Sequence, residues 1–164
     1  MKKPIIYVDE SSFSYIYNPT KDLINKDGCV CLGLVDKRFG DSLFRIGSDK
    51  PDGTFALFRM DSNSIEIISD YTGMRSIWYL QTDEYFITST SQRMIISFLG
   101  DFHPNHSAIS WMLSSGSLGF NNSWDSRINL LPQNSLLRLD RNNWLPSIDG
   151  GPNLDIVSNN ESKE

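Results

Sequence analysis

The feature that most constrains the fold of this chain is a dense β-strand signal in its centre. Residues 54–60 (TFALFRM) and 65–69 (IEIIS) are rich in β-branched and aromatic side chains, and the polar residues 61–64 (DSNS) separate them. Two such runs joined by a short polar turn predict a β-hairpin. Residues 76–80 and 85–88 flank the polar residues 81–84 in the same way and predict a second hairpin. Antiparallel strands must therefore build much of the core.

Weaker patterns place the remaining elements around these hairpins. Further strands are expected at residues 4–9, 29–35, 43–46, 128–131 and 135–139. The run 29–35 is continuously apolar, which is typical of a strand covered on both faces. Ser91 can cap a helix whose apolar residues have helical spacing and which ends at Gly100, and residues 105–113 predict a second helix. Residues 10–28 and 114–126 are interpreted as mostly loop.

Composition predicts one folded domain. With 164 residues, of which 39% are hydrophobic and 21% charged, the chain lies outside the low-hydrophobicity regime of disordered proteins. We expect a domain at residues 1–148. A flexible tail is expected at residues 149–164, because this segment holds Gly-Gly-Pro, Asn-Asn and alternating charge with almost no core-forming residues.

Charge and cysteine content exclude several classes of partner. The formal net charge of -5 leaves no basic surface for nucleic acid, so no nucleic-acid partner is expected. No stretch approaches the roughly 18 apolar residues needed to cross a bilayer, and no membrane partner is expected. Asp9 and Glu10 interrupt any signal-peptide pattern. Cys29 and Cys31 are too few and too close for a secreted disulfide framework, so we expect a cytoplasmic protein.

Five segments occur in an order shared with a known family. Residues 52–57 (DGTFAL), followed by Asp61, resemble that family's D-G-x-F-A-x strand, and residues 70–79 (DYTGMRSIWY) resemble its R-D-x-x-G-x-R-P-L-Y-Y segment. Three shorter matches are residues 86–90 (FITST, like F-A-S-E), 111–116 (WMLSSG, like Y-L-x-x-G) and 128–137 (INLLPQNSLL, like I-x-x-L-P-P-G-x-x-L). Together they resemble the N-terminal domain of asparagine synthetase-related proteins, a class II glutamine amidotransferase domain.

The resemblance implies an α+β fold: an Ntn-hydrolase-like αββα sandwich of mainly antiparallel strands, here shortened. The positions that match the family motifs are Asp52, Gly53, Asp70, Gly73, Arg75 and Tyr79, and we interpret them as structural. Gly73 falls between two strands, where a positive φ is often required, and Asp70 can accept hydrogen bonds from N–H groups of the same turn. A local salt link between Asp70 and Arg75 is one interpretation of this pair, and a ligand-binding role is the other.

The catalytic group of the family is missing. Active members carry an N-terminal Cys whose thiol attacks the glutamine side-chain amide while its free α-amine acts as the base. This chain begins with Met1 and Lys2, neither of which can form such an acyl-enzyme, so no catalytic residue is assigned. Cys29 and Cys31 are interpreted as small buried hydrophobes rather than as a processed nucleophile or half of a metal site.

Two further strings resemble functional motifs without matching them. Residues 47–49 (GSD) are similar to the family's glutamine-binding G-S-D, but only two residues separate Asp49 from the D-G motif where the family has a helix, and we interpret the match as coincidence. Residues 114–119 (SSGSLG) lack the second Gly and the Asp of the S-G-G-x-D-S pyrophosphate loop, so we interpret them as a plain loop.

Histidines and tryptophans add no recognisable chemistry. His103 and His106 flank Pro104 at an expected helix start; a solvated loop and a helix cap are the main interpretation, with metal binding as the alternative. The four tryptophans are assigned to packing, and Trp124, in the Asn/Ser-rich loop, is the one expected to be exposed at an interface.

The function implied by the resemblance is a non-catalytic glutamine amidotransferase-like domain that supports an asparagine synthetase-type, ATP-dependent amide-forming domain in cis or in trans. No cofactor is expected in this chain, since ATP and Mg would bind only the synthetase domain. The chain is not expected to be an enzyme by itself; the family's activity is that of an asparagine synthase or amide ligase. One alternative is that the chain is part of a functioning asparagine synthetase or of a lasso-peptide or β-lactam-type cyclase. Another is a stand-alone binding or scaffold protein.

Overall fold

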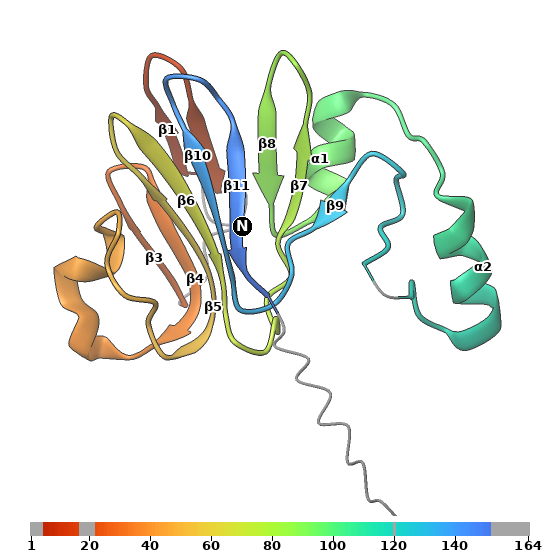
Figure 1. Cartoon of the computed structure of the whole chain (residues 1–164), viewed down its shortest axis with the longest axis horizontal. Helices are drawn as coiled ribbons and strands as arrows, with labels where there is room; N and C mark the ends of the chain where they lie inside the picture. The colour runs from red at the N-terminus through yellow and green to blue at the C-terminus, as the bar shows by residue number, and fades with distance from the viewer. Residues whose placement is uncertain (1–4, 17–21, 120, 152–164) are drawn as a thin grey trace, which may run out of the picture.

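The computed structural model describes residues 5–16, 22–119 and 121–151, shown in Figure 1. Its elements in chain order are β1 (Ile5–Val8), β2 (Phe13–Ile16), β3 (Leu23–Lys26), β4 (Cys29–Val35), the 3-10 helix η1 (Lys37–Phe44), β5 (Gly53–Met60), β6 (Ser64–Ser69), β7 (Trp78–Gln81), β8 (Phe86–Ser89), α1 (Gln92–Leu99), α2 (His106–Ser115), β9 (Asn129–Leu130), β10 (Ser135–Asp140) and β11 (Pro146–Gly150). None of the helices in these residues is long and apolar enough to cross a bilayer.

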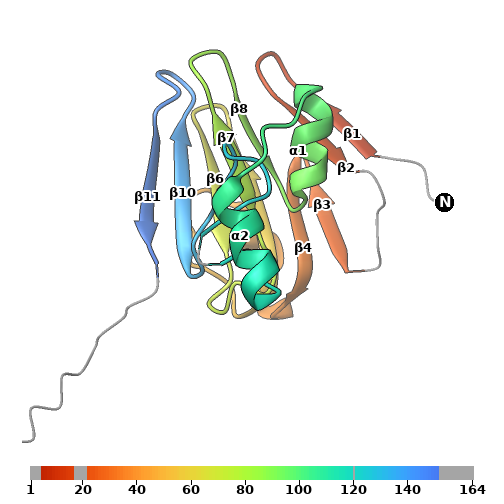
Figure 2. The ribbon, with the colours of Figure 1, turned by 90° about the vertical axis from the view of Figure 1, so that its right-hand side faces the viewer.

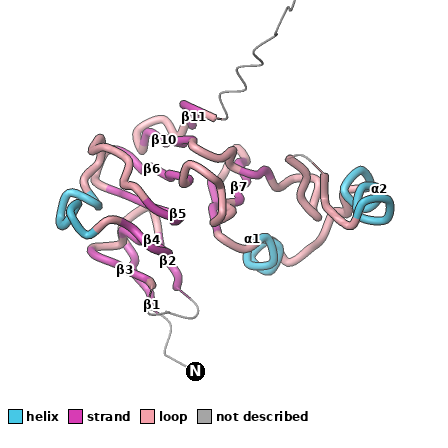
Figure 3. The backbone as a smooth tube through the Cα atoms, turned by 90° about the horizontal axis from the view of Figure 1, so that it is seen from below, coloured by secondary structure: helices cyan, strands magenta, loops and turns pink. Residues whose placement is uncertain are grey.

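The strands form three sheets. The largest has six strands in the order β11-β10-β6-β5-β4-β3, a second has the order β8-β7-β9, and β1 and β2 form a separate hairpin. All pairings among the described strands are antiparallel, which gives a strand-rich mixed fold compatible with the α+β class. In Figure 1 and Figure 3 the three-stranded sheet lies beside one face of the six-stranded sheet, with α1 on its far side.

Three apolar clusters fix the order of these layers. The cluster between the two larger sheets consists of Ala56, Ile67, Leu137, Leu139, Ile77 and Leu131, with Tyr79 and Phe86 packed against it. The opposite face of the six-stranded sheet is covered by η1, whose Leu43 joins Cys31, Phe55, Leu57 and Ile68. A third cluster, Leu80, Ile95 and Ile128, lies between the three-stranded sheet and α1. The layers therefore run η1, six-stranded sheet, three-stranded sheet and α1.

Alternation along β5 explains why its sequence is apolar almost throughout. Phe55 and Leu57 point toward η1, while Ala56 and Phe58 point toward the three-stranded sheet. Successive side chains of a strand face opposite sides, so a strand between two covered faces needs apolar residues at both. This requirement links the densest β signal of the sequence to the centre of the molecule.

Several predicted elements are confirmed. The hairpins at 54–69 and 76–88 are β5–β6 and β7–β8, which pair Met60 with Ile65 and Gln81 with Phe86 next to their turns. α1 ends at Gly100 in a left-handed conformation, as predicted. Ser91 is the N-cap residue of α1, but its side chain makes no capping hydrogen bond. The N-cap of α2 is Asn105, whose side chain accepts from two backbone N–H groups.

Other expectations were wrong. Residues 10–28 were interpreted as mostly loop, yet they contain β2 and β3, each a short strand of four residues. Residues 43–46 were predicted as a strand, but Leu43 and Phe44 end η1 and a bend follows. β11 was not predicted, and its last two residues, Asp149 and Gly150, belong to the segment expected to be a tail. Residues 152–164 of that segment lie outside the described residues.

The helix α2 stands apart from the sheets. Figure 3 shows it beyond α1, on the side away from the six-stranded sheet, and Figure 2 shows the same helix in front of the strands. Its only fully buried residue is Ala108, whereas Trp111 is 52% and Leu113 85% exposed. Trp124, expected to be the exposed tryptophan, is 37% exposed, so Trp111 is the more exposed of the two.

Candidate functional site

The turn between β6 and β7 is organised by the buried carboxylate of Asp70. Its Oδ1 accepts hydrogen bonds from the Thr72 N–H and hydroxyl, both at 2.8 Å, and from the Met74 N–H at 3.3 Å. Its Oδ2 accepts from the N–H groups of Phe55 at 3.2 Å and Arg75 at 3.3 Å. Burial acts to raise the pKa of Asp70, but these hydrogen bonds outweigh it and lower the pKa. The carboxylate therefore holds the turn and ties it to the start of β5.

Gly73 and Arg75 contribute to this turn through their backbone, and Tyr79 contributes a side-chain contact in the strand that follows. Gly73 has a φ of +65°, and a Cβ there would approach the Cβ of Gln133 to 3.0 Å. Arg75 bonds to Asp70 through its backbone N–H, and no described ion pair joins the Arg75 guanidinium to this carboxylate, so the expected salt link is absent from the described residues. Tyr79 stacks on Phe86 with ring centroids 6.1 Å apart, and its burial raises its pKa.

The start of β5 requires Gly53. This residue pairs with Val35 of β4 and has a φ of +142°, and a Cβ there would lie 2.1 Å from the carbonyl oxygen of Leu34. Asp52 is exposed, and its carbonyl accepts from the Asp36 N–H at 3.0 Å. The structure therefore joins Asp70 to the start of β5 through the Phe55 N–H, and the exposed Asp52 directly precedes this strand.

A row of charged residues crosses three strands on the η1 face of the large sheet. Arg59 of β5 is opposite Glu66 of β6, which in turn is opposite Arg138 of β10. Arg59 is fully buried, lies 3.4 Å from Glu66, and donates to the carbonyls of Leu43, Ser48 and Asp49 at 2.6, 2.8 and 3.1 Å. Burial lowers the pKa of Arg59 despite Glu66. This cation therefore fastens the loop that follows η1 to the sheet.

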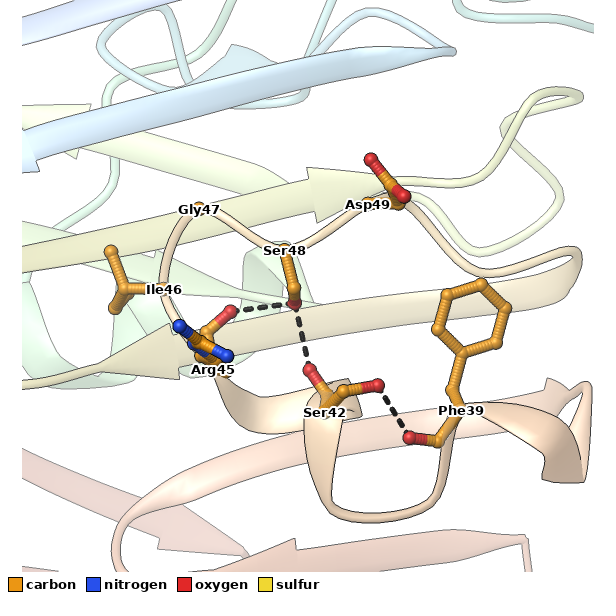
Figure 4. A pocket seen from close by; sticks show the side chains of 7 residues that line it. All are labelled: Phe39, Ser42, Arg45, Ile46, Gly47, Ser48 and Asp49. Carbon is orange, nitrogen blue, oxygen red and sulfur yellow. Dashed lines mark hydrogen bonds between the residues drawn. The ribbon is translucent and has the colours of Figure 1, made fainter.

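That loop lines a shallow pocket of about 390 Å³. Figure 4 shows its lining: Phe39, Ser42, Arg45, Ile46, Gly47, Ser48 and Asp49. The Ser48 hydroxyl contacts the carbonyls of Ser42 and Arg45, both at 2.7 Å, and the Gly47 N–H donates to the Glu66 carboxylate. The segment 47–49, interpreted from the sequence as a coincidental match, is thus a loop held from below by Arg59 and Glu66, with the Asp49 side chain exposed.

Sequence analysis missed a second organised carboxylate, Asp125. It is fully buried, accepts from the His103 N–H at 2.9 Å, and is bound by Arg127 through Nε at 2.9 Å and Nη2 at 2.8 Å. Arg127 also reaches Asp101 at 2.8 Å. The Arg127 hydrogen bond is the main cause that lowers the pKa of Asp125, with burial opposing it. The signal that could have found this cluster is the Asp-x-Arg spacing inside an Asn/Ser-rich loop.

The histidines and cysteines occupy different environments. The His103 side chain is exposed and lies 3.2 Å from Asp101, and His106 is the exposed first residue of α2. Cys29 and Cys31 are buried free thiols, which confirms their expected burial. Burial raises the pKa of both thiols, to about 11 for Cys31. Within the described residues, no three His, Cys, Asp or Glu side chains are grouped so as to hold a metal ion.

Met1 and Lys2, for which no catalytic role is expected, lie outside the described residues. Comparison with models of protein families finds no match to this chain, and comparison with curated proteins finds none either. The interpretation of the site therefore depends on its geometry. In that geometry the buried carboxylates Glu66, Asp70 and Asp125 are each hydrogen-bonded to several donors.

Proposed function

We propose that this chain is a non-catalytic class II glutamine amidotransferase-like domain that supports an asparagine synthetase-type domain, in cis or in trans. The observation that carries the proposal is the Asp70 turn. Its sequence resembles the family's D-x-x-G-x-R segment; Asp70 accepts backbone N–H groups there, including that of Arg75, and Gly73 supplies a positive φ. A motif that shapes a turn can persist after the catalytic group is lost, because the fold still needs it.

The order of layers also supports this proposal. Two antiparallel sheets packed face to face, with η1 outside one and α1 outside the other, are compatible with a shortened Ntn-hydrolase-like αββα sandwich. The outer layer over the six-stranded sheet is reduced to the 3-10 helix η1. In the proposed function this chain supplies a scaffold, and the ATP- and Mg-dependent chemistry belongs to the partner domain.

A scaffold of this kind needs a surface for its partner, and α2 offers one. Residues 102–124, which include α2, contain no Asp, Glu, Lys or Arg, and they expose Trp111 and Leu113. Depletion of charge together with exposed aromatic side chains is typical of the central part of protein interfaces. We assign this face to the synthetase-type domain, whose contacting surface would be uncharged and apolar.

The proposal is tested with a synthetase-type domain that carries an S-G-G-x-D-S loop and is encoded in the same or a neighbouring reading frame. The chain is added to this domain, and ATP-dependent pyrophosphate release and glutamate release from glutamine are both measured. We expect pyrophosphate release to rise without glutamate release. Leu113→Glu should weaken the effect, whereas the control Leu145→Glu, at an exposed leucine outside α2, should leave it unchanged.

Two results would contradict the proposal. Glutamate release that persists after Cys29→Ser and Cys31→Ser are combined would show a glutaminase activity that the non-catalytic assignment denies. Absence of binding to the synthetase-type domain and of any effect on its activity would instead favour a free-standing binding protein.

A further inference from the structure

A second exposed apolar surface lies where the β1–β2 hairpin meets α1. We call it the hairpin–helix surface and define it by Ile6, Val8, Phe13, Met94 and Phe98. Their exposed fractions range from 38% for Met94 to 69% for Val8. Isolated exposed apolar residues are common, but a contiguous group of large ones marks an interaction site.

The backbone pairing and ring contacts make these five side chains contiguous. Val8 and Phe13 are directly opposite one another in the hairpin, and Ile6 lies two residues before Val8 on the same face. The Phe13 ring lies 6.4 Å from the Phe98 ring, so β2 and α1 are in contact there. Met94 precedes Phe98 by one helical turn and lies on the same side of α1. The surface therefore extends without a break from β1 to α1.

The hairpin that carries this surface is fastened from behind. On its inner face the Ser14 hydroxyl donates to the Gly28 carbonyl at 2.9 Å, in the turn between β3 and β4. At its turn, the Asp9 carboxylate is bound by Arg141 at 3.0 Å. The inner face is thus held against the six-stranded sheet, while Ile6, Val8 and Phe13 on the outer face are each more than half exposed. A sheet with one apolar face uncovered lacks the second layer that normally buries it.

One end of the surface is acidic. The turn of β1–β2 carries Glu10, and the turn of β7–β8 carries Asp83 and Glu84, all exposed. Tyr85, which follows Glu84, lies 5.7 Å from Phe98 between ring centroids, and Figure 1 and Figure 2 both show the two turns at the same end of the molecule. Arg93 is the single Lys or Arg in residues 5–16 and 78–100. Arg141 also reaches the β1–β2 turn, where it is paired with Asp9. Glu10, Asp83 and Glu84 therefore give the apolar surface a negatively charged rim.

We propose that the hairpin–helix surface binds an amphipathic α-helix of a partner protein, whose apolar face covers Val8, Phe13 and Phe98. Lys or Arg residues at one end of that helix would lie against Glu10, Asp83 and Glu84. A helix placed beside α1 would cover β1 and β2 as α1 covers β7 and β8, which is the layer arrangement that buries a sheet face. This inference does not depend on the proposed function.

The negative charge of the rim favours a partner helix over a second copy of this chain and over an anionic membrane. In a symmetric dimer built on this surface, each copy would bring its own acidic rim, and like charges across an interface oppose association. An anionic membrane would be repelled by the same rim. A partner helix with a basic end is attracted instead, and its association should weaken as salt screens the rim.

The test uses a synthetic peptide of about 18 residues, long enough for a helix in water. It has Leu and Ala on one face, neutral polar residues on the other and Lys residues at one end, and it carries a fluorescent label. Binding to the full chain is measured by fluorescence anisotropy, with a scrambled peptide of equal composition and a peptide with Glu in place of Lys as controls. We expect only the amphipathic Lys peptide to bind, and more weakly at high salt.

Variants locate the binding. Val8→Ser should lower the affinity for the Lys peptide about tenfold, the effect expected when a central apolar contact is lost. Because Phe13→Ser also removes a ring contact, Val8→Ser is the primary variant, and urea unfolding confirms that it is folded. Leu113→Ser removes a comparable exposed apolar group from α2 and should change the affinity less than about twofold. Glu10→Lys combined with Glu84→Lys should weaken binding of the Lys peptide and strengthen binding of the Glu peptide.

Several outcomes would overturn the inference. Peptide binding that Val8→Ser leaves unchanged would place the site elsewhere. A dimer in sedimentation that Val8→Ser dissociates would assign the surface to a second copy, and binding to vesicles of phosphatidylcholine and phosphatidylglycerol that Val8→Ser abolishes would assign it to a membrane. Peptide binding only after removal of residues 152–164 would assign it to the chain's own C-terminal segment.

Discussion

The assignment of Asp70 to a structural role makes a specific prediction for Asp70→Asn. The two side chains have nearly the same shape, so the substitution removes one acceptor and the charge without opening a cavity. The amide has one oxygen, which can replace Oδ1 toward Thr72 and Met74. Its NH2 group must then face the N–H groups of Phe55 and Arg75, which are donors as well.

The cost follows from the two hydrogen bonds that lose their shared acceptor, Oδ2. A hydrogen bond to a charged group contributes about 1.5–3 kcal/mol, and a buried donor left without an acceptor costs a similar amount. The Phe55 bond is buried and the Arg75 bond is partly buried, so the second counts for less. We expect Asp70→Asn to lower the free energy of unfolding by about 3 kcal/mol, a large effect for so conservative a change.

Urea unfolding followed by tryptophan fluorescence measures this cost, and Asp61→Asn is the matched control. Asp61 also organises a turn between strands, but it is exposed and accepts from Asn63 and Ser64 through Oδ1 alone, both at 2.8 Å. An asparagine oxygen can make the same two bonds, so Asp61→Asn should cost less than about 1 kcal/mol. Equal costs for the two substitutions would refute the interpretation that Asp70 needs both carboxylate oxygens as acceptors.

The pH dependence of stability provides an independent check on Asp70. Its pKa in the folded protein is lowered, so its carboxylate stabilises the fold above the unfolded pKa of about 3.9. That contribution is lost as the pH falls through the lower pKa of the folded state. Asp70→Asn has no such group, and its stability should therefore fall less steeply than that of the wild type below about pH 4. Parallel curves would argue against a lowered pKa.

Three further substitutions or labels test other parts of the structure. Gly53→Ala should cost at least about 3 kcal/mol in urea unfolding, because its Cβ would lie 2.1 Å from a backbone oxygen, whereas Gly47→Ala, with open space around its Cβ, should cost about 1 kcal/mol. Arg59→Met should lower the unfolding free energy by about 3 kcal/mol, since one carbonyl of η1 and two of the following loop lose their buried donor. Cys29 and Cys31 should resist a thiol-specific disulfide reagent at pH 7 until urea unfolds the chain, because burial raises the pKa of both.

The sequence predicted elements that depend on local pattern and missed those that depend on distant contacts. The β5–β6 hairpin was found because apolar residues fill both strands and a polar turn joins them. Leu43 was placed in a strand because its neighbours are apolar, but it belongs to η1 and is buried against Phe55 and Leu57 of β5. β2 and β3 were missed because four-residue strands give little signal, and β11 because an exposed edge strand needs no apolar pattern.

The same distinction holds for the site. That Asp70 can accept N–H groups of its own turn was predicted from its place in the turn, and the structure confirms bonds to Thr72 and Met74. Its bond to Phe55, fifteen residues earlier in the chain, requires the sheet to be formed and could not be read locally. Arg59 lies within a predicted strand, but the sequence does not show whether its side chain is buried or solvated. It is buried because the loop that carries Ser48 and Asp49 folds over it.

These contacts divide the described residues into two groups with different consequences. Glu66, Asp70 and Asp125 are buried and bound by several donors, and the pKa of Asp70 and of Asp125 is lowered, so neither of these two can take up a proton near neutral pH. Substitutions in this group should change stability. The exposed groups on α2 and on the hairpin–helix surface stabilise little, and their substitution should change binding alone. Both proposals place the function of the chain on those surfaces, so binding assays with Val8→Ser and Leu113→Glu test them directly.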